Sequence, residues 1–264
     1  MTETPQIDPS TPHSARVWNY WLGGKDNYPS DREVGDQIAG FFPDIIDSAR
    51  ADRAFLGRAV RYLAGEVGIR QFLDIGTGLP TADNTHEVAQ RVAPESRVVY
   101  VDNDPLVLIH AEALLTSTPP GVTEYIQADI HDPGTILREA AKTLDFDRPV
   151  GLMLLAIVQF ILDDDEAAQV MRRLIDALAP GSHVAISHGT NEINTEASDA
   201  AVAYWNQYAK PPMVLRDARQ IAKLLDGLEL LEPGVVSCSR WRPEAIPWGE
   251  PTPVPHYCAV ARKN

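Results

Sequence analysis

The sequence predicts an α/β protein in which a mostly parallel sheet is covered by helices on both faces. Short apolar runs alternate with helical patterns from about residue 70 onward. These runs are nearly continuous, which is typical of parallel strands buried on both sides. Near the end of the chain, two such runs flank a proline-rich loop with no room for a crossover helix, and strands joined in this way are most simply antiparallel.

The N-terminal part of the chain has a helical pattern. After a polar leader, Ser30 and Glu33 have the spacing of a capping box, in which two side chains satisfy backbone groups at a helix start. Apolar residues then recur at helical spacing over residues 45–63. We therefore expect residues 1–68 to form a helical extension or lid packed on the core, and residues 69–264 to complete one structural domain.

Seven strands are expected to form the sheet, which should be mostly parallel with an antiparallel terminal strand. Several intervening helices begin with an acidic cap, and in Asp104-Pro105 and Asp132-Pro133 a proline occupies the first helical position. Asp163 offers a further cap. The expected strands are Gln71–Ile75, Arg97–Val101, Glu124–Gln127, Gly151–Ala156, His183–Ser187, Leu228–Val236 and Tyr257–Ala261.

Charge and composition disfavour several kinds of partner. The 264 residues include 37 acidic and 23 basic side chains, giving a net charge of −14. Such a surface repels phosphate backbones and anionic lipid, so we expect neither a nucleic-acid nor a membrane partner. No apolar run approaches the roughly 20 residues that cross a bilayer, and the N-terminus lacks the pattern of a secretory signal. We therefore expect a cytoplasmic protein.

The cysteines and histidines give no sign of a metal centre. Cys238 and Cys258 are the only two cysteines, which excludes a disulfide scaffold, and in the cytoplasm they should remain free buried thiols. The histidines have no partners at metal-ligand spacing. We expect no metal.

The segment Phe72–Leu79 carries the strongest chemical signal. A strand reaches Asp74, and Gly76, Thr77 and Gly78 then form a tight turn before the next helix. Glycines at such a turn let backbone N–H groups approach a ligand closely, and the crevice lies at the carboxyl edge of the sheet. A plain glycine turn would have the same pattern, so further evidence is needed.

Acidic residues at the next two strand ends supply that evidence. Asp102 ends the second strand, where a carboxylate can accept hydrogen bonds from both hydroxyls of a ribose. Asp129 follows the third strand, where it can accept from an adenine amino group. The position of the third glycine of a dinucleotide fingerprint is Thr81, which disfavours a nicotinamide-dependent oxidoreductase. An acid at Asp74 favours a ligand with an ammonium group, and S-adenosyl-L-methionine meets these requirements.

The same segments resemble a known enzyme class. Asp74–Gly78, Asp102-Asn103 and Ala128-Asp129 resemble the first three motifs of class I S-adenosyl-L-methionine-dependent methyltransferases, and Leu152–Gln159 resembles the fourth. Ala15–Asn27 is similar to the N-terminal block of a bacterial methyltransferase family formerly classed as a domain of unknown function. The resemblance implies the Rossmann-like class I fold and S-adenosyl-L-methionine as cofactor, but it leaves the acceptor nearly undefined.

The resemblance also implies roles for individual residues. The turn glycines would approach the methionine part of the cofactor, Asp102 would hold the ribose, and Asp129 with Ile130 would bind the adenine. Relatives often carry a histidine where this chain has Gln159, so a base is not expected there. The implied cofactor contacts are Asp74, Gly76, Thr77, Gly78, Asp102, Asn103, Asp129, Ile130 and the backbone carbonyl of Ala156.

Two aromatic segments admit both a functional and a purely structural interpretation. In the N-terminal block, Arg16 or Lys25 could reach the carboxylate of the cofactor from a lid, and bidentate geometry favours Arg16. Alternatively, the tryptophans of this block only pack a helix onto the sheet. Residues 191–212 could cover the acceptor, but the helical spacing of Tyr204, Trp205 and Tyr208 is also that of an ordinary core.

His188 is the best candidate for a general base. It follows the fifth predicted strand and is expected to point toward the crevice mouth, although a hydrogen-bonded core histidine is the alternative. The expected function is methyl transfer from S-adenosyl-L-methionine to an undefined acceptor, with a small molecule favoured. The alternative is a non-catalytic S-adenosyl-L-methionine-binding sensor or partner module.

Overall fold

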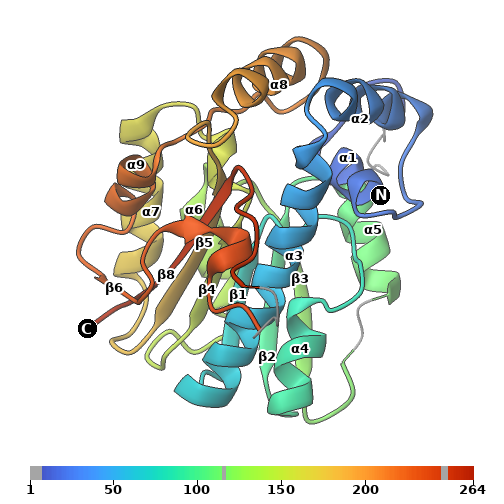
Figure 1. The fold of residues 1–264 in the computed structure, drawn as a ribbon. Coiled ribbons are helices and arrows are strands. Elements are labelled where there is room, and N and C mark those ends of the chain that lie inside the picture. The colour runs from blue at the N-terminus through green and yellow to red at the C-terminus, as the bar shows by residue number, and fades with distance from the viewer. Residues whose placement is uncertain (1–7, 115–116, 245–248) are drawn as a thin grey trace.

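The computed structural model describes residues 8–114, 117–244 and 249–264. The first seven residues of the expected N-terminal extension, and residues 245–248 of the proline-rich loop, lie outside the described residues. A single sheet forms the centre of the protein, with strand order β3-β2-β1-β4-β5-β8-β6 and β7 paired with β8 (Figure 1). The predicted α/β class is confirmed.

The first five strands are parallel and the last is reversed, as predicted. β8 (His256–Arg262) pairs antiparallel with β5 over its whole length, so its first residue lies opposite Gly189 at the carboxyl end of β5. The parallel strands are β1 (Gln71–Ile75), β2 (Arg97–Asp102), β3 (Val122–Gln127), β4 (Gly151–Leu155) and β5 (His183–Gly189).

The described residues form eight strands rather than the expected seven. The segment predicted as one strand is divided into β6 (Glu229–Leu230) and β7 (Val236–Ser237), and both pair antiparallel with β8. Pro233 has no N–H to donate to a strand neighbour, and Gly234 has a left-handed φ of 83°. The chain therefore turns between the two short strands.

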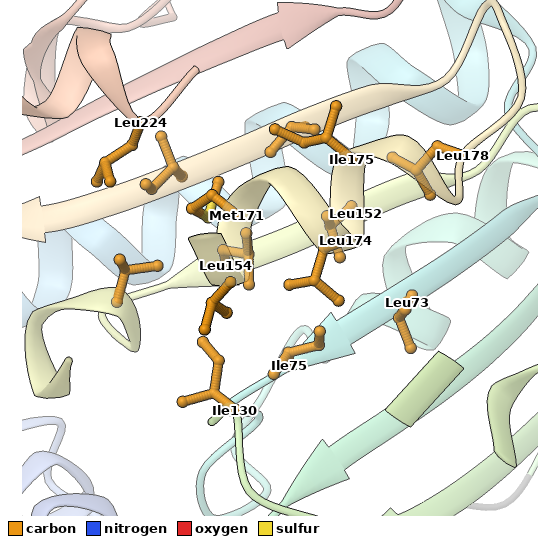
Figure 2. Close-up of a cluster of buried hydrophobic side chains, with 14 of the residues drawn as sticks. Leu73, Ile75, Ile130, Leu152, Leu154, Met171, Leu174, Ile175, Leu178 and Leu224 are labelled. Carbon is orange, nitrogen blue, oxygen red and sulfur yellow. The ribbon is translucent and has the colours of Figure 1, made fainter. Parts of the chain in front are cut away.

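Helices cover both faces of the sheet because side chains alternate along each strand. Leu73 and Ile75 of β1 face the core that Figure 2 shows, together with Met171 and Leu174, whereas Phe72 faces the opposite core. The first face is covered by α6 (Pro133–Ala140), α7 (Asp164–Asp176) and α9 (Ala218–Lys223), and the second by α3 (Asp44–Tyr62), α4 (Thr85–Val92) and α5 (Pro105–Leu114).

The acidic caps lie where the sequence predicts them. The backbone N–H of Leu106, Thr135 and Glu166 donates to Asp104, Asp132 and Asp163, respectively, at 2.8–3.0 Å. The predicted cap at Ser30 is wrong, because α2 (Pro29–Phe41) already begins at Pro29. There the carboxylate of Asp31 accepts the backbone N–H of Tyr28, and the hydroxyl of Ser30 donates to the carbonyl of Pro9 instead.

A third apolar cluster joins the N-terminal helices to a late segment of the chain. It contains side chains of α1 (Ser14–Trp21), α2 and α8 (Thr195–Tyr208), which lie together at one end of the sheet (Figure 1). Short helical turns complete the fold at Leu63–Val67, Val158–Phe160 and Cys238–Arg240. Within the described residues, no helix has both the length and the apolar character that a membrane crossing requires.

Candidate active site

A cavity opens at the carboxyl ends of the parallel strands. It is bounded by the glycine turn after β1, by the ends of β2 and β4, by the segment after β3, and by side chains of α1 and α3. We call this cavity the strand-end cleft. Arg16 is the one predicted cofactor residue that does not line it; the cleft is lined by Asp74, Gly76, Thr77, Gly78, Asp102, Asn103, Asp129, Ile130 and Ala156.

The glycine turn combines a tightly held backbone with an open side. Gly76 and Gly78 have left-handed φ angles of 78° and 67°. The N–H groups of Gly76 and Thr77 donate to the carbonyl of Val101 at 2.8 and 3.2 Å. A Cβ on Gly76 would lie 2.6 Å from Ile157, whereas a Cβ on Gly78 would meet nothing within 4 Å. Gly78 is therefore the point where a ligand can approach the backbone.

Two carboxylates flank this turn. Asp74 is 4% exposed, accepts the hydroxyl of Thr85 at 2.6 Å, and has its pKa raised by burial to about 6. Asp102 accepts the backbone N–H groups of Gly78 and Asp104 at 2.8 and 2.9 Å, and burial raises its pKa as well. The acid of β2 thus fixes the shape of the turn after β1.

The third acid belongs to a small polar cluster. Asp129 accepts from the side-chain amide of Asn103 at 2.8 Å and from Nδ1 of His131 at 2.6 Å. Burial raises the pKa of Asp129, but the hydrogen bonds from His131 and Asn103 outweigh this effect, so the pKa lies below its ordinary value. His131 lines the cleft and was missed from the sequence, although it lies only two residues beyond Asp129.

The end of β4 has a strained backbone. Ala156 has a φ of 51°, a left-handed conformation that costs a non-glycine residue about 1–2 kcal/mol. Its N–H group donates to the carbonyl and to the hydroxyl of Ser187 in β5, at 3.1 and 3.0 Å. Strained residues of this kind are concentrated at functional sites, and Ala156 lies on the cleft wall.

The expectation that Arg16 reaches into the cleft is contradicted by its position. The Arg16 side chain is buried, and its guanidinium contacts the carboxylate of Asp31 at 3.2 Å and the carbonyls of Asp8 and Thr11. It therefore holds the N-terminal segment against α2. Arg53 of α3 lines the cleft instead, and its Nε and Nη2 donate to the carbonyl of Ala82 at 3.1 and 2.8 Å.

His188 does not point toward the crevice mouth as predicted. Its side chain is completely buried, with Nδ1 2.8 Å from the carbonyl of Gly189 and Nε2 accepting from Arg216 at 2.9 Å. Burial lowers the pKa of His188 to about 3. The alternative that the sequence left open, a hydrogen-bonded core histidine, matches this geometry.

A second cavity adjoins the strand-end cleft and shares Ser14, Trp18, Gln159 and Phe160 with it. Among the described residues, the walls of this second cavity contain no Asp, Glu, Lys or Arg. We call it the apolar chamber, and its aromatic walls are Trp18, Trp21, Phe42, Phe160 and Trp205.

Aromatic residues of the N-terminal block and of residues 191–212 both pack in the core and line the chamber. Trp205 is buried, its Nε1 donates to the carbonyl of Pro211 at 2.7 Å, and it both belongs to the third apolar cluster and lines the chamber. Trp18 likewise packs in that cluster and borders both cavities. Tyr208 is exposed. Trp18 and Trp205 therefore serve both as packing residues and as cavity walls.

The sheet order, the reversed terminal strand and the acids at the strand ends define the class I methyltransferase fold. The N-methyltransferase NodS from Bradyrhizobium japonicum, solved with S-adenosyl-L-homocysteine, shares this fold at 13% identity and a TM-score of 0.50, covering 94% of this chain and 98% of that chain. The family described as S-adenosyl methyltransferase matches residues 1–264, and the chain belongs to this family.

Two solved structures are similar over essentially the whole chain. A DUF574 family protein from Streptomyces avermitilis is 47% identical, with a TM-score of 0.93, covering 98% of this chain and 100% of that chain. A protein from Thermobifida fusca is 38% identical, with a TM-score of 0.90 and coverage of 100% and 99%. Among curated proteins, no sequence matches the chain.

The cofactor of this family, S-adenosyl-L-methionine, fits the charge of the cleft. Four carboxylates line it, those of Asp52, Asp74, Asp102 and Asp129, and Arg53 is the only Lys or Arg among the described lining residues. An ammonium and a sulfonium group carry the positive charge that such a cleft attracts. The open side of Gly78 adds a place for close backbone approach.

Proposed function

We propose that the protein transfers the methyl group of S-adenosyl-L-methionine to an uncharged small molecule held in the apolar chamber. The observation that carries this proposal is the shared wall of the two cavities, which would bring a donor and an acceptor side by side. Holding two reactants in line lowers the barrier by several kcal/mol, about 7–11 in favourable intramolecular cases. The absence of charged side chains from the described chamber wall supports an uncharged acceptor.

Within this proposal, the residues of the cleft bind and orient the donor, which supplies an electrophilic methyl group on sulfur. We assign the ribose to Asp102, the adenine to Asp129, Ile130 and Asn103, and the ammonium group to Asp74 and the carbonyl of Ala156. We assign the carboxylate of the cofactor to Arg53, which lines the cleft, instead of Arg16, which does not.

We further propose that the described part of the N-terminal extension, residues 8–68, covers the site. Trp18 of α1 borders both cavities, and His13, which precedes α1, pairs with Asp104 at 3.0 Å next to the cleft. The buried free thiols of Cys238 and Cys258 support a reducing, cytoplasmic compartment. The net charge of −14 supports an acceptor other than nucleic acid.

Filling the apolar chamber should block methyl transfer without weakening cofactor binding. Ala201 is a buried residue of α8 that lines the chamber, so Ala201→Phe places a ring where the acceptor would lie. We expect turnover to fall by at least roughly tenfold, equivalent to 1.4 kcal/mol, while the Kd for S-adenosyl-L-methionine stays unchanged in calorimetry. The matched control is Ala200→Phe, one position along the same helix and exposed. Equal turnover in both variants would contradict the assignment.

Calorimetry and an acceptor screen separate the proposal from its two rivals. A methyltransferase should bind S-adenosyl-L-methionine and its demethylated product, and should release that product with at least one uncharged acceptor. Tight binding without turnover over a broad panel would favour a sensor or partner module. Binding of a nicotinamide cofactor in the same cleft would favour an oxidoreductase, and Thr81 at the third glycine position is evidence against that outcome.

A further inference from the structure

The strand-end cleft and the apolar chamber meet at a buried histidine and aspartate. His256 lines the chamber and Asp52 lines the cleft, and the two residues are 3% and 5% exposed. Asp52 lies on α3. His256 is the first residue of β8 and pairs with Gly189, the last residue of β5. It therefore lies at the carboxyl ends of the parallel strands, where both cavities open.

The imidazole of His256 has no hydrogen-bond partner in the part of the chain that the structure describes. Its Nε2 is buried and unsatisfied, 3.8 Å from Oδ1 of Asp52, and no described residue bonds to its Nδ1. The ring packs at 5.7 Å, centroid to centroid, against Trp18, which borders both cavities. A buried polar group without a partner is rare and calls for an explanation. Nε2 faces Asp52, so Nδ1 is the ring nitrogen that is left for a ligand in the chamber.

His256 is also the only ionisable side chain among the described residues that line the chamber. The other candidates for proton transfer are unsuitable. Both ring nitrogens of His188 are occupied within the core, and His188 lines neither cavity. Gln159 cannot accept a proton at neutral pH, and its Oε1 accepts the N–H of Gly189 at 3.1 Å.

We propose that His256 is the general base for methyl transfer, that Asp52 positions it, and that the acceptor is a flat, uncharged molecule with a hydroxyl group of phenol type. This inference rests on the proposed function. The hydroxyl proton passes to His256 Nδ1, the oxygen lone pair forms the bond to the methyl carbon, and the carbon–sulfur bond breaks with its electron pair remaining on sulfur. Asp52 faces Nε2 and stabilises the imidazolium that forms.

The surroundings of His256 suit this role. Burial lowers the pKa of His256, which favours the neutral ring that a general base requires, and the nearby carboxylate of Asp52 opposes that effect. The titratable groups that face it are Asp52 from α3, the thiol of Cys238 from the turn after β7, and His188 from β5. The aromatic walls of the chamber accommodate a flat ring.

The first test uses two phenols that differ in acidity. His256→Gln should lower methyl transfer to p-cresol by about 10²–10⁴-fold, the usual contribution of a general base. Transfer to p-nitrophenol, measured where that phenol is already ionised, should change little. The Kd for S-adenosyl-L-methionine should be unchanged. The matched control is His183→Gln, a buried histidine of β5 that lines neither cavity and should leave both rates unaltered.

The outcomes separate this inference from the proposed function. Equal rates for wild type and His256→Gln with p-cresol would overturn the base but leave methyl transfer intact. If wild type methylates other uncharged acceptors but neither phenol, the substrate class is overturned. Cofactor binding without any turnover would instead contradict the proposed function.

The second test is independent of turnover. In the S-adenosyl-L-homocysteine complex, we expect the imidazole resonances of His256 to titrate at lower pH in Asp52→Asn than in wild type, because the carboxylate stabilises the charged ring. Identical titrations would overturn the pairing. Loss of wild-type activity on chelation, with recovery on adding Zn²⁺, would also overturn the inference. Asp52, Cys238 and His256, whose ligand atoms lie within 4.8 Å of one another, would then be metal ligands.

Discussion

Gly76→Ala is expected to lower the melting temperature by roughly 5–15 °C and to weaken S-adenosyl-L-methionine binding at least about tenfold. Two costs add at this position. A φ of 78° is unfavourable for alanine by about 1–2 kcal/mol, and a Cβ would lie 2.6 Å from the Cβ and Cγ1 atoms of Ile157. Overpacking of this kind costs about 1–3 kcal/mol. Any shift that relieves the overlap also moves the floor of the cleft.

Gly78→Ala is the matched control for this substitution. Its φ of 67° brings a similar backbone cost, but a Cβ there would meet nothing within 4 Å. Thermal unfolding without cofactor should therefore show the smaller loss for Gly78→Ala, about 1–2 kcal/mol. If the two variants unfold at the same temperature, the close packing of the turn on Ile157 is not a determinant of stability.

Arg216→Met is expected to destabilise the fold by about 3–5 kcal/mol, because several buried acceptors lose their donor and each unsatisfied group costs about 1–3 kcal/mol. Arg216 is 1% exposed and donates to the carbonyls of Val158 and Ile161, to His188, and to Asp164 at 2.9 Å. Methionine fills much of the space but leaves the carbonyls of Val158 and Ile161 and the ring of His188 unpaired inside the protein, whereas the exposed carboxylate of Asp164 is solvated. Denaturant unfolding measures the loss.

Arg219→Met provides the control for the change of side-chain type. Arg219 lies three residues further along, on α9, and is exposed. Its replacement should change stability by no more than about 0.5 kcal/mol. A small effect at both positions would mean that the guanidinium network around His188 contributes little to the fold.

The residues that line the strand-end cleft from the sheet could be located from the sequence because their placement is local. Asp74 and Asp102 lie at the carboxyl ends of β1 and β2, and Asp129 lies just beyond β3. The carboxyl ends of parallel strands meet at one edge of the sheet. Gly76 and Gly78 follow directly from the first of these strands. Such positions depend on strand direction alone, so the motifs were sufficient to predict that these acids and glycines lie together at the strand-end cleft.

Where the side chains of Arg16 and His188 point could not be predicted in this way, because it depends on contacts with other elements and on where a strand ends. Arg16 binds Asp31, a competing carboxylate that a later helix brings near. His188 was expected beyond the end of its strand, but β5 continues to Gly189, so His188 lies within the sheet and its ring is buried there. The pattern of residues near a strand end does not reveal where the strand stops.

His256 was missed for a topological reason. The last strand was expected to begin at Tyr257, after a proline-rich loop. Because β8 is antiparallel, its first residue, not its last, lies at the functional edge of the sheet. Asp52 is more than 200 positions earlier in the chain, and only the packing of α3 on the sheet brings the two together.

A crystal structure with S-adenosyl-L-homocysteine would be the most direct test of the proposed cofactor and acceptor sites, because it shows where the cofactor lies relative to the acids at the strand ends. We predict ribose hydroxyls bonded to Asp102, the adenine between Asp129 and Ile130, and the sulfur directed toward the apolar chamber where Trp18 borders both cavities. Adenosine density outside the strand-end cleft, or a sulfur atom directed away from the chamber, would contradict it.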